Sequence, residues 1–351
     1  MSKRIDNFDY LRIIGSILIV FYHYEMAYHS MYGNKLVFYG DSFRVEYVVE
    51  LFFILSGFLT ARRRNNKRFI SAMLVKWVRV YPIALMSIMV SFLSLLLRVL
   101  FTPLPFPEYP SGSIIASILL VHQGWIVTYD YAINTPTWYL CVLLMCYILY
   151  YLIDSLDRKI SLGAARGLLY FFIMVLAVAV HRYELPFLKI KSCRGYLAFF
   201  AGVVVCELFK TISSRRLVVY GILLASAGTV LIYISRVSFF WESLASVIMF
   251  GGIVMVIGNI RQFPNRVARR LGSSSFEVFL FHVPVIELSN IIVYILKLSY
   301  TRSVISMTVL LIAVEIMAVY INKYIEIPLN RKIRKKLDDH KIIRYYSDVA
   351  V

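Results

Sequence analysis

Ten apolar runs, each close to the length that a helix needs to cross a lipid bilayer, recur along the 351 residues of this sequence. A hydrocarbon core about 30 Å thick requires roughly 20 residues of α-helix. The runs cover residues 10–29, 46–61, 77–101, 137–153, 166–181, 195–209, 217–234, 240–258, 276–296 and 303–324. The pattern predicts an all-α, polytopic integral membrane protein with about ten transmembrane helices.

The composition agrees with a membrane protein, because 60% of the residues are hydrophobic and only 17% are charged. Soluble domains carry about 25% charged residues. The formal net charge of +18 could indicate a nucleic-acid partner. The basic residues fall between the apolar runs, however, as orientation signals of membrane proteins do. We therefore expect a lipid bilayer and no nucleic acid as the partner.

A strongly basic connector follows the second run. It contains Arg62, Arg63, Arg64, Lys67, Arg68, Lys76 and Arg79. Because positive residues flank the cytoplasmic ends of membrane spans, this connector and the N-terminus are predicted to be cytoplasmic. An eleventh apolar run, residues 113–127, would turn the later basic connectors outward if it crossed the membrane. We therefore predict that 113–127 is a re-entrant or interfacial helix and that both termini are cytoplasmic.

The chain is predicted to form a single membrane domain over residues 1–351, because no hydrophilic block is long enough for a separate soluble domain. Its core covers about 8–328, and residues 329–351 form a basic cytoplasmic tail. The four cysteines form no C-x-x-C pair. We therefore expect neither a metal site nor a disulfide framework.

One histidine, His23, lies near the centre of the first apolar run. Asp9 and Arg12 occupy positions i and i+3 at the predicted cytoplasmic end of the same helix. Arg12 and His23 are eleven residues apart, which is roughly 16 Å along a helix and close to three turns. They therefore project from nearly the same face. An ionisable residue at this depth usually has a function; the alternative is a histidine that only packs helices together.

Two other stretches place polar residues in apolar surroundings. Glu50 opens the second run, in which the small residues Ser56 and Gly57 are expected to allow close helix packing. The run 276–296 contains His282 and Pro284. Because proline frees a backbone carbonyl inside a helix, the histidine and proline together could also form a polar kink without a catalytic role.

Seven motifs in order resemble the membrane-bound acyltransferase 3 family, from Asp9 to about Pro328. They are FDYLR with FYHY, ELFFILSGFL, KWVRVYP, NTPTWYL, RGYLAFFAG, SSFEVFLFHVPV and KYIEIP. The resemblance implies a ten-span O-acyltransferase of the bacterial inner membrane. Such an enzyme takes an acyl group from acyl-CoA at the cytoplasmic side and passes it to a hydroxyl of an exopolysaccharide or other cell-surface glycan. Acetyl-CoA is the expected donor, and no metal is expected.

The resemblance also implies roles for individual residues. His23 matches the essential histidine of the family, and acyl transfer to an alcohol needs a general base, which imidazole provides near neutral pH. Asp9 and Arg12 match its D-x-x-R pair. Lys76 and Arg79 match its R-x-x-R element, in which lysine replaces the first arginine and so loses the bidentate fork. The cations expected to bind the phosphates of CoA are Arg12, Arg62, Arg63, Lys76 and Arg79.

The remaining site residues are predicted as supporting groups. A carboxylate is expected to orient His23, with Glu50 as the first candidate and Glu25 and Glu277 as alternatives. Trp138, Tyr139 and His282 are candidates for binding the sugar. Many glycan-modifying members of the family carry two glutamates after this tryptophan, whereas this chain has two leucines there. No role can therefore be given to a carboxylate at that place.

Two other functions remain open from the sequence. A transporter or flippase for a glycan or lipid-linked sugar would use His23, Glu50 and His282 as a proton or substrate pathway. A catalytically inactive relative would act as a scaffold in a glycan-assembly complex, although the joint presence of Asp9, Arg12 and His23 argues against it. Release of CoA from acyl-CoA is the observation that distinguishes the enzyme from both.

Overall fold

The computed structural model describes residues 4–32, 45–64, 68–129, 132–234, 239–297 and 303–339, and within them the chain is helical without a named β-strand. The α-helices are α1 (Asn7–Tyr32), α2 (Val48–Arg62), α3 (Phe69–Phe101), α4 (Ser113–Ile118), α5 (Trp138–Ile160), α6 (Ala165–Val180), α7 (Ile190–Thr211), α8 (Ser214–Ile234), α9 (Phe239–Asn259), α10 (Arg266–Ile295), α11 (Ser303–Ile321) and α12 (Ile327–Asp339). Short helical turns are η1 (Val45–Tyr47), η2 (Thr135–Thr137) and the π-helical η4 (Asn322–Glu326).

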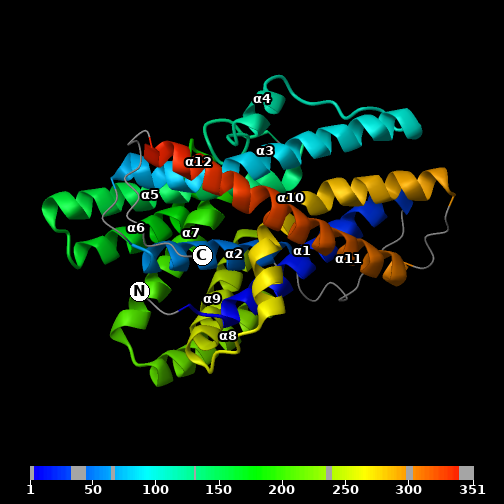
Figure 1. The fold of residues 1–351 in the computed structure, drawn as a ribbon. Coiled ribbons are helices and arrows are strands. Elements are labelled where there is room, and N and C mark those ends of the chain that lie inside the picture. The colour runs from blue at the N-terminus through cyan, green and yellow to red at the C-terminus, as the bar shows by residue number, and fades with distance from the viewer. Residues whose placement is uncertain are drawn as a thin grey trace.

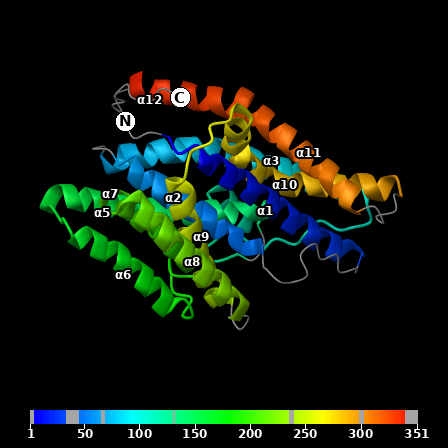
Figure 2. The ribbon, with the colours of Figure 1, turned by 90° about the horizontal axis from the view of Figure 1, so that it is seen from below.

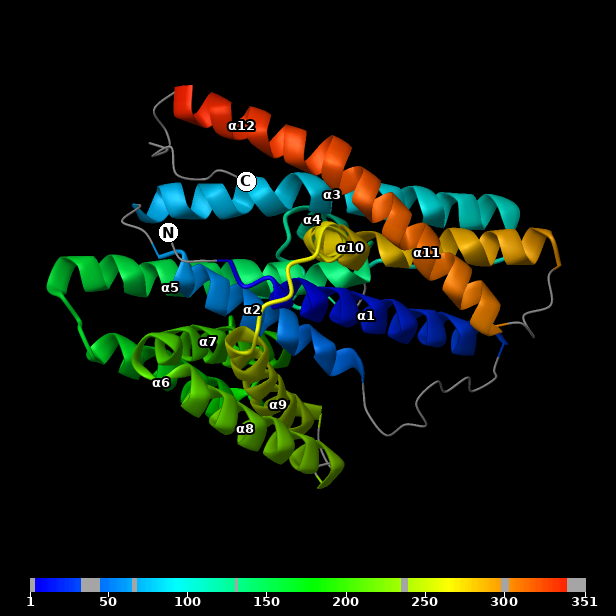
Figure 3. The same ribbon diagram turned by 60° about the horizontal axis from the view of Figure 1, so that its bottom comes forward.

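The helices form an elongated bundle in which segments far apart in the sequence pack together (Figure 1). Helix α1 packs along α10, α2 along α7, and α8 along α9. Figures 2 and 3 show α11, η4 and α12 on one side of the bundle and α6 and α8 on the other. The first residues of α1 and α10 lie close to the last residues of α9, because Asn7 Nδ2 donates to the Arg261 carbonyl (3.0 Å) and Arg269 pairs with Asp6 (3.1 Å). We call this the basic end of the bundle.

Seven helices in the described part of the chain are long and apolar enough to cross a membrane. They are α3, α5 with its preceding turn, α7, α8, α9, α10, and α11 together with α12. The all-α, multi-pass membrane fold is therefore confirmed. Helices α2 and α6, with 15 and 16 residues, are shorter, and α1 also falls outside this set. The count of ten spans stays a prediction.

The eleventh apolar run does not form a continuous helix. Only α4 is helical, and the chain from Leu119 to Tyr129 folds back as an irregular loop. Within it, Trp125 Nε1 donates to the Cys141 carbonyl of α5 (3.1 Å), and Gln123 Nε2 donates to the Tyr129 carbonyl (2.5 Å). The loop is therefore packed on α5, and its re-entrant or interfacial placement in the bilayer stays a prediction.

Glycines bring α2 and α7 into backbone contact. A Cβ atom added at Gly57 would lie 1.9 Å from the Phe199 carbonyl oxygen, and one added at Gly202 would lie 2.0 Å from the Ile54 oxygen. These distances are far below van der Waals contact, so both positions require glycine. The predicted packing role of Gly57 is confirmed, and the rigid α2–α7 pair forms one wall of the core.

Ion pairs join three helices at the basic end. Arg64, which follows α2, contacts both Asp154 and Asp157 of α5 at 2.5 Å. Arg166 of α6 contacts Asp157 at 2.9 Å. The Asp154 side chain is buried, so its charge needs such a partner. Arg64, which the sequence places in the same basic run as Arg62 and Arg63, is thus held by α5.

Candidate active site

The imidazole of His23 is oriented by its own helix. Its Nδ1 lies 3.1 Å from the carbonyl oxygen of Ile19, one turn earlier in α1. A carbonyl only accepts hydrogen bonds, so Nδ1 of the neutral ring carries the hydrogen and Nε2 keeps a lone pair. The sequence predicted a carboxylate in this orienting role. The structure provides a backbone carbonyl instead, and leaves Nε2 able to accept a proton.

A second histidine, His282 of α10, lies against His23. The ring centroids are 4.6 Å apart, with the ring planes at 61°. The His282 side chain is fully buried, and its Nδ1 lies 3.1 Å from the Val278 carbonyl, again one turn earlier. The sequence analysis predicted separate roles for the two histidines, a general base and a sugar contact. The contact between α1 and α10 makes them a pair, which we call the histidine pair.

The side chain of Asn134 binds the backbone of α10 near the histidine pair. Pro284 has no N–H, so the carbonyl of Leu280, four residues earlier, loses its helical partner. The side chain of Asn134 replaces it: Nδ2 donates to Leu280 O at 2.9 Å and to Ser87 Oγ of α3 at 3.0 Å. The freed carbonyl expected at Pro284 is therefore bonded. Asn134 belongs to the NTPTWYL motif, but sequence reasoning gave it no role of its own.

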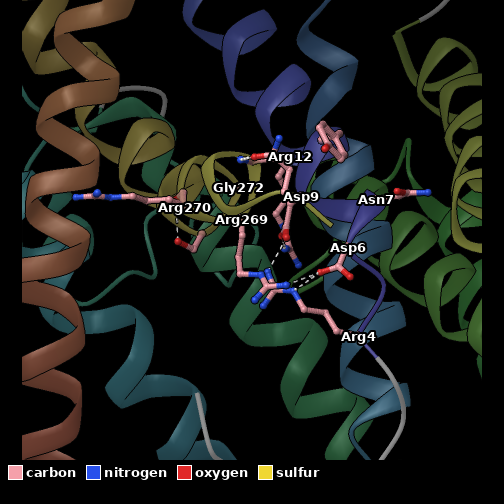
Figure 4. Close-up of polar contacts among 12 residues, drawn as sticks. Arg4, Asp6, Asn7, Asp9, Arg12, Arg269, Arg270 and Gly272 are labelled. Carbon is pink, nitrogen blue, oxygen red and sulfur yellow. Dashed lines mark hydrogen bonds and ion pairs between the residues drawn. The ribbon is translucent and has the colours of Figure 1, made fainter. Parts of the chain in front are cut away.

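At the basic end, Asp9 joins two arginines (Figure 4). The buried carboxylate of Asp9 contacts Arg12 at 2.9 Å and Arg4 at 2.6 Å. The predicted i, i+3 pair of Asp9 and Arg12 is thus formed. Arg12 also interacts electrostatically with Arg63 and Arg79. Arg63 and Arg79, like Arg4, are therefore close enough to Arg12 to affect its charge at the start of α1.

Lys76 extends this group of cations. Its Nζ donates to Thr60 Oγ1 at 3.0 Å and lies 4.2 Å from the ring centroid of Tyr147. It interacts electrostatically with Arg63 and Arg79. We call Arg12, Arg63, Lys76 and Arg79 the cation cluster. Since like charges repel, such a cluster is favourable when an anion binds to it.

Arg62 lies over an aromatic ring and lines a cleft. Its guanidinium carbon lies 5.8 Å from the Phe58 ring centroid. It lines a cleft of about 410 Å³, together with Arg4, Lys210 and Gln262. The cleft lies between the N-terminal residues, α2, α7 and the segment after α9. The predicted CoA ligands therefore divide, with four in the cation cluster and Arg62 beside this cleft.

The carboxylate of Glu50 is held by other groups than His23. Arg194 of α7 contacts it through Nε at 2.7 Å and through Nη2 at 3.1 Å, and Ser243 Oγ donates to it at 2.6 Å. Glu50, Arg194 and Ser243 are all buried. This buried ion pair joins α2, α7 and α9. The geometry thus gives Glu50 a partner that the sequence did not predict, and its catalytic role is not supported by a contact with His23.

The alternative carboxylate Glu277 also has its own partner, because Asn322 Nδ2 donates to its Oε1 at 3.0 Å. The same amide donates to Glu326 at 2.6 Å. Both carboxyl groups are buried. Glu277 therefore takes part in a contact between α10 and the π-helical turn η4. This contact does not support the role of orienting His23 that the sequence suggested for Glu277.

Trp138 and Tyr139, the candidate sugar contacts, face different neighbours. The half-buried ring of Trp138 has Lys191 Nζ at 5.5 Å and the Arg194 guanidinium carbon at 5.7 Å from its centroid. The Tyr139 hydroxyl lies 3.1 Å from Ser56 Oγ, and its ring packs against Phe279. Tyr139 is therefore a buried contact between α5, α2 and α10, whereas Trp138 lies beside basic residues of α7.

The fold and site together define a multi-pass helical membrane protein with a histidine pair between α1 and α10 and a cation cluster near the start of α1. The chain belongs to the acyltransferase 3 family, because the family model described as an acyltransferase domain matches residues 5–321. The family resemblance of the seven motifs is therefore confirmed. The comparisons with curated proteins and with solved structures each gave no match.

Proposed function

We propose that this protein is a membrane O-acyltransferase that moves an acyl group, with acetyl as the expected group, from acyl-CoA to a hydroxyl of a cell-surface glycan. The observation that carries the proposal is the placement of Arg12 and His23 on one helix. Arg12 belongs to the cation cluster, and His23 lies eleven residues further along α1, roughly 16 Å deeper. One helix thus joins the proposed anion-binding end to a half-buried base.

The cation cluster supports acyl-CoA as the donor. The pyrophosphate and 3′-phosphate of CoA are anions, and arginine and lysine are the side chains that bind phosphate. We propose that Arg12, Arg63, Lys76 and Arg79 hold these phosphates at the basic end, on the cytoplasmic side of the bacterial inner membrane. Asp9 then fixes the direction of Arg12. The acyl group would extend from there toward His23.

His23 is proposed as the general base. Its Nε2 takes the proton of the acceptor hydroxyl while the hydroxyl oxygen bonds to the thioester carbonyl carbon. The C–S bond breaks, and the CoA thiolate leaves and receives the proton. The products are an ester on the glycan and CoA with a free thiol. Trp138 supports sugar binding, because aromatic rings at the edge of a site offer an apolar face with polar neighbours.

The first experiment uses radiolabelled acetyl-CoA with membrane vesicles whose cytoplasmic face is outward. We expect label in the glycan fraction and release of free thiol with the wild-type protein. His23→Ala should lower both by roughly 10²- to 10⁴-fold, as loss of a general base does, while the amount of protein in the membrane stays unchanged.

The same assay distinguishes the rival functions. A transporter or flippase would move its substrate without cleaving the thioester, and an inactive scaffold would release no thiol either. Unchanged labelling of the glycan by the His23→Ala protein would refute the role of His23. Absence of thiol release by the wild type, in the presence of the glycan of its own cell envelope, would refute the acyltransferase.

A further inference from the structure

We infer that His282 is a positioning residue that shares with His23 the proton taken from the acceptor hydroxyl. The inference rests on the proposed function and deepens it, because it replaces the expected carboxylate by a second neutral imidazole. It is carried by three features of the histidine pair: the state of the two rings, an unsatisfied nitrogen, and the partners of the nearby carboxylates.

The first feature is the hydrogen position on both rings. Each Nδ1 lies 3.1 Å from a carbonyl oxygen one turn earlier in its own helix, Ile19 for His23 and Val278 for His282. Both carbonyls only accept, so each neutral ring is protonated at Nδ1. Each Nε2 then points away from its own helix backbone and carries a lone pair.

The second feature is the unsatisfied Nε2 of His282. This atom is buried and has no hydrogen-bond partner among the residues that the structure describes. Buried polar atoms almost always have partners, and an exception needs an explanation. The His23 ring lies against the His282 ring, with 4.6 Å between the centroids. Both Nε2 atoms are acceptors, so a single added proton would give them a donor to share.

The third feature is the position of the acidic residues. In a catalytic triad a carboxylate stabilises the histidine once it has accepted a proton. Here Glu50 is bonded to Arg194 and Ser243, and Glu277 is bonded to Asn322. Glu25 is two residues from His23 on α1, and side chains at that spacing do not face each other on a helix. Two polar rings pack against His23, those of His282 and Tyr22, with centroids at 4.6 and 5.0 Å. The Tyr22 hydroxyl donates to Glu46 at 2.8 Å, so His282 is the one of the two with an acceptor nitrogen. A neutral imidazole with a free lone pair is a suitable acceptor for the N–H of an imidazolium.

The proposed step conserves atoms and charge. The O–H bond of the acceptor breaks and its proton binds Nε2 of His23, while the new C–O bond forms and the C–S bond breaks. The proton is held between the Nε2 atoms of His23 and His282 in an N–H···N hydrogen bond. It then passes to the sulfur of the CoA thiolate, and both rings return to the neutral state.

The test compares His282→Ala, which leaves a space the size of an imidazole, with His282→Leu, which fills it. The purified protein is assayed with acetyl-CoA and its glycan acceptor by thiol release. We expect kcat to fall about tenfold or more in both variants, while the loss stays below that of His23→Ala. The KM for acetyl-CoA should not change, because His282 lies outside the cation cluster. Added imidazole should restore part of kcat in His282→Ala and none in His282→Leu.

The matched control is His122, which is also buried but contacts Cys141 Sγ at 3.3 Å in the loop packed on α5. His122→Ala should keep the wild-type kcat. A merely structural role of His282 predicts a loss of thermal stability without rescue by imidazole. Should His282→Ala fail to fold, His282→Gln decides, because glutamine keeps a polar side chain but cannot share a proton in this way.

The outcomes separate the inference from the function on which it rests. A wild-type protein that releases no thiol with its glycan present overturns the proposed function. An active wild type together with a His282→Leu or His282→Gln variant of unchanged kcat overturns the inference alone. A folded His282→Ala protein of low kcat that imidazole does not rescue also overturns it.

Discussion

At the scale of single residues, backbone carbonyls orient the two histidines. The sequence had led us to expect a carboxylate in this role for His23. His23 and His282 are each held by the carbonyl one turn earlier, and the carbonyl freed by Pro284 is bonded by an asparagine. Carbonyl groups carry no net charge, so they orient polar side chains inside a membrane domain at a lower desolvation cost than ions.

Asn134 offers a direct test of this arrangement. Asn134→Leu removes the donor of Leu280 O and leaves a buried carbonyl unpaired, which should cost about 1–3 kcal/mol of stability. Thermal unfolding in detergent measures the loss. Ser87→Ala is the control: it removes the bond from the same amide to Ser87 Oγ and the bond from Ser87 Oγ to the Ala84 carbonyl, but it leaves Leu280 O paired. We expect a loss of about 1 kcal/mol. Equal stability of Asn134→Leu and the wild type would contradict the role of this side chain.

At the scale of elements, close helix contacts decide which side chains meet. Helix α1 approaches α10 at Gly272, where an added Cβ would lie 2.6 Å from Asp9 Cβ and 2.8 Å from its Cα. Figure 4 shows Gly272 beside Asp9. The same two helices carry the histidine pair, so the spacing set at Gly272 also sets the distance between His23 and His282.

Gly272→Ala should therefore separate α1 from α10. Overpacking of this kind costs roughly 1–3 kcal/mol, and we expect acyl transfer to fall by more than the loss of folded protein explains. Gly251→Ala is the matched control, because a Cβ at Gly251 of α9 meets nothing within 4 Å. It should leave activity unchanged and stability equal or slightly higher. Wild-type activity of Gly272→Ala would show that the spacing is not set here.

At the scale of the whole molecule, the basic end predicts the direction of the bundle in the membrane, with both termini cytoplasmic. Arg182 lies after α6, at the end of that helix opposite Arg166, and Arg215 lies at the start of α8; both side chains are exposed. We expect Arg182→Cys in intact cells to react with a membrane-impermeant maleimide, and Arg215→Cys to react only after permeabilisation. The native cysteines are buried and give a low background. The reverse labelling pattern would contradict the predicted cytoplasmic termini.

The sequence predicted contacts within a helix better than contacts between helices. The pair of Asp9 and Arg12 could be predicted because a spacing of three residues places side chains on one face. The pairs of His23 with His282 and of Glu50 with Arg194 could not, because helix periodicity does not determine which helices are neighbours. The apolar runs predicted the fold class, and the family motifs supplied the residue set. The geometry of the site needed the tertiary packing of α1, α2, α7 and α10.

The short helix α6 has a consequence for the surrounding lipid. With 16 residues, it is about 24 Å long, whereas a typical hydrocarbon core is about 30 Å thick. Helix α6 lies at one side of the bundle (Figure 2), and many of its residues are exposed. If α6 crosses the membrane, the acyl chains beside it must compress or its polar ends must reach outward, because hydrophobic mismatch is relieved in these ways. The bilayer next to this protein would then be locally thinned, and membranes of shorter lipids would accommodate it with less elastic deformation.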